Sequence, residues 1–173
     1  MTCPANYFVS AKPSRSFYLL HLETILSWPI AFLIDSVVKV EASGEIETEE
    51  LVEHFRGSQN VFSAAGIFTI LQSAALLEMA NAVVANDTSI VHLAEAMRTS
   101  SIALFGPTVK EFGYAPMLEQ SRLIETDLAL RCRPCSRTGK GTCKNRDQQI
   151  CMYSISTQKV WDAAQSLLPK VRA

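Results

Sequence analysis

Short apolar runs alternate with amphipathic stretches along the chain from residue 37 to residue 108. Short continuous apolar runs are typical of strands buried on both faces, whereas apolar residues at intervals of three and four indicate helices. The predicted strands cover residues 37–40, 60–62, 82–85 and 101–105. The predicted helices between them cover residues 45–56, 69–79 and 89–98. The chain is therefore predicted to alternate between strand and helix.

Residues at the ends of these stretches support the helix boundaries. Thr69 and Gln72 have the spacing of a capping box, in which each side chain bonds the backbone of the other residue. Gly57 follows the helix predicted over residues 45–56, as glycine commonly does at a helix end. Ser156 is placed to cap a last helix. That helix carries one apolar stripe, formed by Val160, Ala163, Ala164 and Leu167.

This alternation predicts the α/β fold class, a Rossmann-like parallel sheet with helices on both faces. Each connection between parallel strands must cross over, and the crossover is normally a right-handed helix. With 173 residues and 48% hydrophobic composition, the chain can bury one substantial core. We expect one domain over residues 37–173, with a polar, cysteine-containing segment at residues 130–152. Residues 1–36 show no clean period and no predicted element.

Charge and targeting signals limit the possible partners. The 16 basic and 17 acidic residues nearly cancel, so no global field would attract nucleic acid, and any anion must be bound locally. The N-terminus has no basic region leading into an apolar stretch, which favours the cytoplasm. Residues 17–34 are apolar, but His21, Glu23 and Pro29 argue against a membrane-spanning helix. Burial in the core or contact with a neighbouring domain is expected for this stretch.

The best candidate binding site follows the predicted strand at residues 82–85. In an open parallel sheet, ligands bind beyond the carboxyl ends of the strands, where helix N-termini present unpaired amides. Asp87, Thr88 and Ser89 occupy such a place, and the amides of residues 88–91 are available to a phosphate or a sugar hydroxyl. His92 lies one turn further along and can face the same cleft. The alternative is structural, with Asp87 as a helix cap and His92 as a core histidine.

Two longer motifs extend this site. The string Asn86-Asp87-Thr88-Ser89-Ile90-Val91-His92-Leu93-Ala94-Glu95-Ala96-Met97 is followed by Ala103-Leu104-Phe105-Gly106-Pro107-Thr108. Together they resemble the signature of glycosyltransferase family 9, which includes the ADP-heptose:lipopolysaccharide heptosyltransferases. The resemblance runs from about Gly44 to the C-terminus. It includes Cys132-Arg133-Pro134-Cys135 and Cys151-Met152-Tyr153-Ser154-Ile155-Ser156.

The resemblance implies a GT-B arrangement of two Rossmann-like domains, of which the C-terminal one holds the nucleotide-sugar. Asp87 would accept hydrogen bonds from the donor sugar, and the backbone at Thr88 and Ser89 would help to hold the diphosphate. His92 would support this loop or contact the phosphate. The implied reaction is an inverting transfer to lipopolysaccharide core or lipid A that requires no metal cofactor. Family members are about twice this length. We expect their N-terminal domain, which carries the proposed catalytic carboxylate, to be missing from this chain, so no catalytic residue is assigned here.

This sequence departs from the family pattern at three places. Ser89 stands where glycine usually follows the Asp-Thr pair, which narrows the space for a sugar. The family's diphosphate-binding lysine is followed closely by Trp-Pro, but Lys12 precedes Pro13 and the Trp28-Pro29 pair lies downstream. Lys12 is therefore a donor-binding candidate with an exposed lysine as the alternative. The ribose-binding glutamate corresponds to Glu45 or Glu47, with a solvated helix start as the alternative.

Four of the five cysteines fall within twenty residues, at Cys132, Cys135, Cys143 and Cys151. The first spacing, Cys-x2-Cys, suits one structural zinc ion or an iron-sulfur cluster, but the usual second close pair is absent. Free thiols or occasional disulfides are the alternative. Basic residues nearby are expected to favour the thiolates and to lie in a solvated loop or to meet an anionic acceptor. These residues are Arg131, Arg133, Arg137, Lys140, Lys144 and Arg146.

The leading hypothesis is the donor-binding domain of a heptosyltransferase-like enzyme, incomplete without its N-terminal half. It would act in the cytoplasm, in peripheral contact with the inner membrane, on an ADP-sugar donor. The first alternative is a non-catalytic nucleotide-binding remnant. The second is a zinc-stabilised interaction module.

Overall fold

The structure is a computed structural model that describes residues 7–11, 37–40, 61–63, 68–139 and 141–167. Its centre is a six-stranded sheet with the strand order β3-β2-β1-β4-β5-β6. The strands are β1 (Tyr7–Ala11), β2 (Val37–Val40), β3 (Val61–Ser63), β4 (Ala80–Asn86), β5 (Ser101–Phe105) and β6 (Arg122–Glu125). The helices are α3 (Ile70–Glu78), α4 (Ser89–Ala96), α5 (Ile150–Tyr153) and α6 (Thr157–Leu167), with a short 3-10 helix, η1 (Lys110–Phe112).

Five of the six strands run in the same direction, and β1 runs against them. β2 pairs in parallel with β3, and β4, β5 and β6 pair in parallel with one another. β1 lies between β2 and β4 and pairs antiparallel with both, with Tyr7 opposite Val40 on one side and Ala85 on the other. The predicted α/β fold class is confirmed. The antiparallel β1 is a difference, because no element was predicted within residues 1–36.

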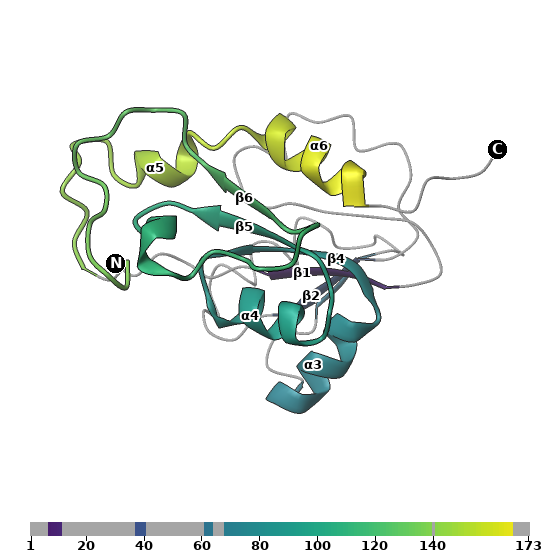
Figure 1. Ribbon diagram of the computed structural model, residues 1–173. Coiled ribbons are helices and arrows are strands. Elements are labelled where there is room, and N and C mark those ends of the chain that lie inside the picture. Colours follow the sequence, from purple (N-terminus) through teal and green to yellow (C-terminus); the bar gives the residue numbers. More distant parts are fainter. Residues whose placement is uncertain (1–6, 12–36, 41–60, 64–67, 140, 168–173) are drawn as a thin grey trace.

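Helices cover both faces of the sheet, as Figure 1 shows, with α3 and α4 below it and α5 and α6 above it. Alternate residues of the central strands point to opposite sides, as the strand period of two requires. On β4, Val83 and Ala85 belong to the core cluster between the sheet and helices α3 and α4. Ala82 and Val84 belong to the cluster on the opposite face, between the sheet and helices α5 and α6. Burial on both faces explains why these strands are continuously apolar.

The predicted helix starts are confirmed where the structure describes them, whereas the helix predicted over residues 89–98 ends at Ala96. Thr69 caps α3 in a full capping box, since its hydroxyl accepts from the Gln72 amide and the Gln72 side chain accepts from the Thr69 amide. At the other end of the chain, α6 buries Val160 and Ala164, two residues of the predicted stripe. Leu77 of α3 is fully buried and anchors that helix to the sheet.

Besides β1, three elements were missed, namely η1, β6 and α5, and several predictions fall outside the described residues. β6 and α5 lie in the stretch after Thr108 that shows only a polar pattern in the sequence. The helix predicted over residues 45–56 and the apolar stretch at residues 17–34 lie outside the residues that the structure describes. Within the described part of the chain, no helix is long and apolar enough to cross a membrane.

Candidate functional site

Polar side chains gather where β4, β5 and β6 end at the same edge of the sheet. Asp87 directly follows β4, Thr108 follows β5 after a two-residue turn, and Glu125 is the last residue of β6. Because these three strands are parallel and adjacent, their carboxyl ends lie side by side. This edge is where open α/β sheets bind ligands.

Asp87 is held in place by the neighbouring strand end. The Thr108 hydroxyl donates a hydrogen bond of 2.6 Å to Oδ2 of Asp87, and the Asp87 amide donates one of 3.0 Å to the Leu104 carbonyl. Thr108 is 3% exposed, whereas Asp87 is half-buried. A carboxylate has about four acceptor positions, and Thr108 is its one side-chain partner among the described residues. The remaining positions can accept hydrogen bonds from a ligand.

The N-terminus of α4 lies next to this carboxylate. Thr88 is the N-cap residue and makes no side-chain capping bond, and its hydroxyl oxygen is buried without a partner in the described part of the chain. Ser89 is the first helical residue and is exposed. The alternative in which Asp87 is only a helix cap is wrong, because its carboxylate bonds Thr108 instead of the first turn of α4.

The other predicted donor-site residues are less closely connected. His92 is exposed on α4, one turn after Thr88, so it is not the buried core histidine of the structural alternative. Across the described residues, no contact joins His92 to Asp87 or Thr108. Lys12, Glu45 and Glu47 lie outside the described residues, and their roles stay predictions.

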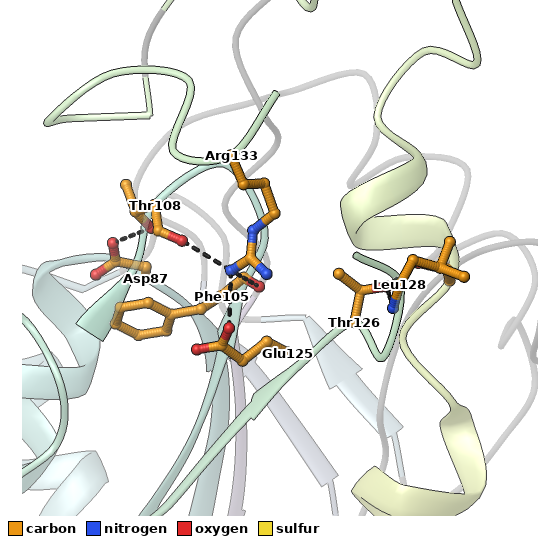
Figure 2. A network of polar contacts seen from close by, with 8 residues as sticks. Asp87, Phe105, Thr108, Glu125, Thr126, Leu128 and Arg133 are labelled. Atoms are coloured by element: carbon orange, nitrogen blue, oxygen red, sulfur yellow. Dashed lines mark hydrogen bonds and ion pairs between the residues drawn. The ribbon is translucent and has the colours of Figure 1, made fainter. Parts of the chain in front are cut away.

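Arg133 also belongs to this edge of the sheet, although no individual role was predicted for it. Its side chain is only 10% exposed, and Nη2 lies 3.1 Å from Oε2 of Glu125. The same nitrogen donates to the Thr108 carbonyl at 2.9 Å (Figure 2). The prediction of a solvated basic loop is therefore wrong for Arg133. The spacing of residues in the sequence holds no sign of this contact, because Arg133 and Thr108 are twenty-five positions apart.

The turn between β5 and Thr108 is also covered by the cysteine-containing segment. The Cys135 amide donates to the Pro107 carbonyl at 2.9 Å. Gly106 is buried against α5, and a Cβ atom there would lie 2.1 Å from Sδ of Met152. The close approach requires glycine at this position.

The four clustered cysteines lie in the same region. The Asn145 side chain donates to Sγ of Cys132 and the Gln149 amide donates to Sγ of Cys143. Cys135, Cys143 and Cys151 line a hollow of about 90 Å³. Among the described residues, no group of three or more histidine, cysteine, aspartate and glutamate side chains has an arrangement that could hold a metal ion. The zinc ion thus stays a prediction, which the zinc content of the purified chain tests.

Burial affects the pKa of the Cys135 thiol more than the neighbouring charges do. Desolvation raises its pKa above the usual value, and the neighbouring Cys132 and Cys143 thiols raise it further. Lys144 and Arg133 act in the opposite direction but do not outweigh these effects. Lys144 and Arg133 thus favour the Cys135 thiolate, as expected, but burial outweighs them and the net shift of the pKa is upward.

Comparison with known proteins identifies the family of this chain. The model of glycosyltransferase family 9 (heptosyltransferase) matches residues 36–144, which is more than half of the chain. The chain belongs to glycosyltransferase family 9. The family match contains Asp87, Thr108 and Arg133, so the polar edge of the sheet lies within the matched residues.

Two curated relatives of this family 9 chain carry the same name. The lipooligosaccharide heptosyltransferase 2 of Haemophilus influenzae is 30% identical over 131 residues, covering 73% of this chain and 37% of that protein. The lipooligosaccharide heptosyltransferase 2 of Campylobacter jejuni is 28% identical over 166 residues, covering 95% of this chain and 49% of that protein. The chain thus spans half or less of the length of these relatives. No solved structure matches it significantly.

Proposed function

We propose that this chain binds the nucleotide-sugar donor of a heptosyltransferase, with ADP-heptose as the donor and lipopolysaccharide core or lipid A as the acceptor. Family membership and the names of the two relatives support the reaction class. The observation that carries the assignment of the site is the Asp87 carboxylate, fixed by Thr108 at the carboxyl edge of the sheet beside the N-terminus of α4.

The chemistry of this edge suits a sugar joined to a diphosphate. The acceptor positions of Asp87 that Thr108 does not use would bind sugar hydroxyls, since a carboxylate accepts several hydrogen bonds at once. The amides at the start of α4 carry the positive end of the helix dipole, so those of Ser89 and Ile90 would hold the diphosphate, whereas the Val91 amide donates to the Thr88 carbonyl. Sugar and diphosphate would then lie next to each other, as they do in the donor.

The proposed reaction is an inverting displacement. An acceptor hydroxyl attacks the anomeric carbon of the donor sugar, the bond to the diphosphate oxygen breaks, and nucleoside diphosphate leaves. The charge that develops on the leaving oxygen would be stabilised by the amides of α4, for which no metal ion is required. Asp87 positions the sugar in this scheme and is not the general base, which we assign to an acceptor domain outside this chain. The complete enzyme would work at the cytoplasmic face of the inner membrane.

Calorimetric titration of the chain with ADP, ADP-heptose, UDP-glucose and GDP-mannose tests the proposal. We expect ADP compounds to bind selectively, and Asp87→Ala to remove the preference for ADP-heptose over ADP. Asp127→Ala is a matched control, because Asp127 is exposed and its ion pair with Lys159 lies on the surface. Such a pair contributes little to stability.

The result also separates the proposal from its two alternatives. Binding of ADP without any transfer, even after an N-terminal half from a relative is added, would support the non-catalytic remnant. Stoichiometric zinc binding without affinity for any nucleotide would support the interaction module. Binding of all four nucleotides with equal affinity in the presence and absence of the Asp87 carboxylate would refute the donor site.

A further inference from the structure

Arg133 is an unusual side chain for a loop. Arginine is seldom buried unless it is paired, because a guanidinium loses its hydration on burial. Here the side chain is 10% exposed, and its Nε is buried without a partner among the described residues. The other contacts of this arginine explain why it is buried.

The guanidinium joins two strand ends and the turn between them. Nη2 lies 3.1 Å from the Glu125 carboxylate at the end of β6, and 3.4 Å from the carbonyl of Phe105 at the end of β5. The shortest of its contacts is the 2.9 Å hydrogen bond to the carbonyl of Thr108. Figure 2 shows the guanidinium between Glu125 on one side and Thr108 on the other.

Thr108 is consequently held at both ends. Its carbonyl accepts from Arg133, and its hydroxyl donates to Asp87. The direction of a threonine hydroxyl depends on the orientation of its backbone, since a β-branched side chain has few rotamers. Arg133 therefore fixes the backbone that aims the hydroxyl, and the hydroxyl fixes the carboxylate.

We propose that Arg133 is a positioning residue of the donor site: acting through Thr108, it orients Asp87 and so sets the preference for a nucleotide that carries a sugar over the bare nucleotide. The inference rests on the proposed function and deepens it. Arg133 itself touches no donor atom, and Glu125 compensates its buried charge. The cysteine-containing segment thereby contributes to donor selection through one of its arginines.

Nucleotide binding by three variants of the full chain provides the first test. Arg133→Met should weaken ADP-heptose binding about tenfold, as expected for a displaced hydrogen-bonding group, while ADP affinity changes less than twofold. Arg133→Lys keeps the charge and one donor nitrogen on a shorter side chain, so we expect an intermediate loss. Arg137→Met is the matched control, because Arg137 is an exposed arginine of the same loop.

A double-mutant cycle distinguishes positioning from a general structural role. If Arg133 acts through Asp87, Arg133→Met has no further effect on ADP-heptose binding once Asp87→Ala is present. A merely structural role would weaken ADP and ADP-heptose equally and would add to Asp87→Ala. Arg133→Met leaves the partly buried Glu125 carboxylate without its partner. The double variant Arg133→Met with Glu125→Met removes this uncompensated charge as well and is the second variant to be tested.

A measurement without nucleotide makes the outcome independent of donor binding. The carboxyl ¹³C resonance of Asp87, recorded at one pH, should move in Arg133→Met in the same direction as in Thr108→Val. An unmoved resonance would overturn the inference, whether or not the chain binds nucleotide. A moved resonance in a chain that binds no nucleotide would overturn the donor-binding function and the role in sugar preference, whereas the coupling of Arg133 to Asp87 would stand.

Discussion

Replacing Thr108 with valine removes the hydroxyl that orients Asp87 and nearly preserves the shape of the side chain. The lost hydrogen bond, 2.6 Å long, has the Asp87 carboxylate as its acceptor. Hydrogen bonds to charged groups contribute about 1.5–3 kcal/mol to stability. Asp87 is half-buried, so water can replace part of the interaction. We therefore expect the lower end of this range, a decrease of about 1.5 kcal/mol in the free energy of unfolding.

Two measurements should report this loss. For a domain of this size, each kcal/mol lowers the melting temperature by about 2–4 °C, so Thr108→Val should melt about 3–6 °C below the wild type. The released carboxylate must also be ordered again when a sugar binds, which costs about 0.5–1.5 kcal/mol. ADP-heptose should thus bind about two- to tenfold more weakly, and ADP should bind as before.

Differential scanning calorimetry measures the melting temperature, and isothermal titration calorimetry measures the two affinities on the same protein sample. Thr108→Ser retains a hydroxyl and should recover part of the ADP-heptose affinity. Thr138→Val is the control for the loss of an exposed threonine hydroxyl in the neighbouring loop. A Thr108→Val protein with wild-type melting temperature and unchanged affinities for both nucleotides would show that this hydrogen bond does not organise the site.

Three further substitutions test the packing and the site. Leu77→Ala empties a fully buried position and should cost about 2–5 kcal/mol in chemical denaturation, whereas Leu71→Ala, at a position 79% exposed, should change stability by less than about 0.5 kcal/mol. Gly106→Ala places a methyl group against Met152 and should cost about 1–3 kcal/mol; combining it with Met152→Ala should cost less than the sum of the two single effects. Ser89→Gly should strengthen ADP-heptose binding in titration, because it opens space beside Asp87. An unchanged affinity would show that Ser89 does not restrict the space for the sugar.

The centre of the fold could be predicted because its signals are local. β4 and β5 are buried on both faces, which makes each of them a continuous apolar run that is recognisable without knowledge of its neighbours. The start of α3 was equally readable, since the Thr69 and Gln72 side chains bond within one helical turn. Asp87 was found for the same reason: it follows a strand and precedes a helix.

The features that were missed depend on partners far away in the sequence. β6 contains a single buried residue, Ile124, between partly or fully exposed neighbours, so its pattern is too short to indicate a strand. β1 forms by pairing with β2 and β4, about thirty and seventy-five positions away. Arg133 resembles any other basic loop residue until the fold places it beside Thr108 and Glu125.

The contribution of the cysteine-containing segment to the site does not require a metal ion. The turn at residues 106–108 carries Thr108, and this segment contacts it from several directions. Arg133 and Cys135 bond its carbonyls, Met152 lies against Gly106, and a Cβ atom on Gly139 would lie 3.0 Å from the Pro107 ring. These contacts leave the turn little freedom to move, because packed interiors transmit displacement instead of absorbing it. A zinc ion bound by the cysteines would therefore affect donor binding through the same turn, and its removal should weaken ADP-heptose binding more than ADP binding.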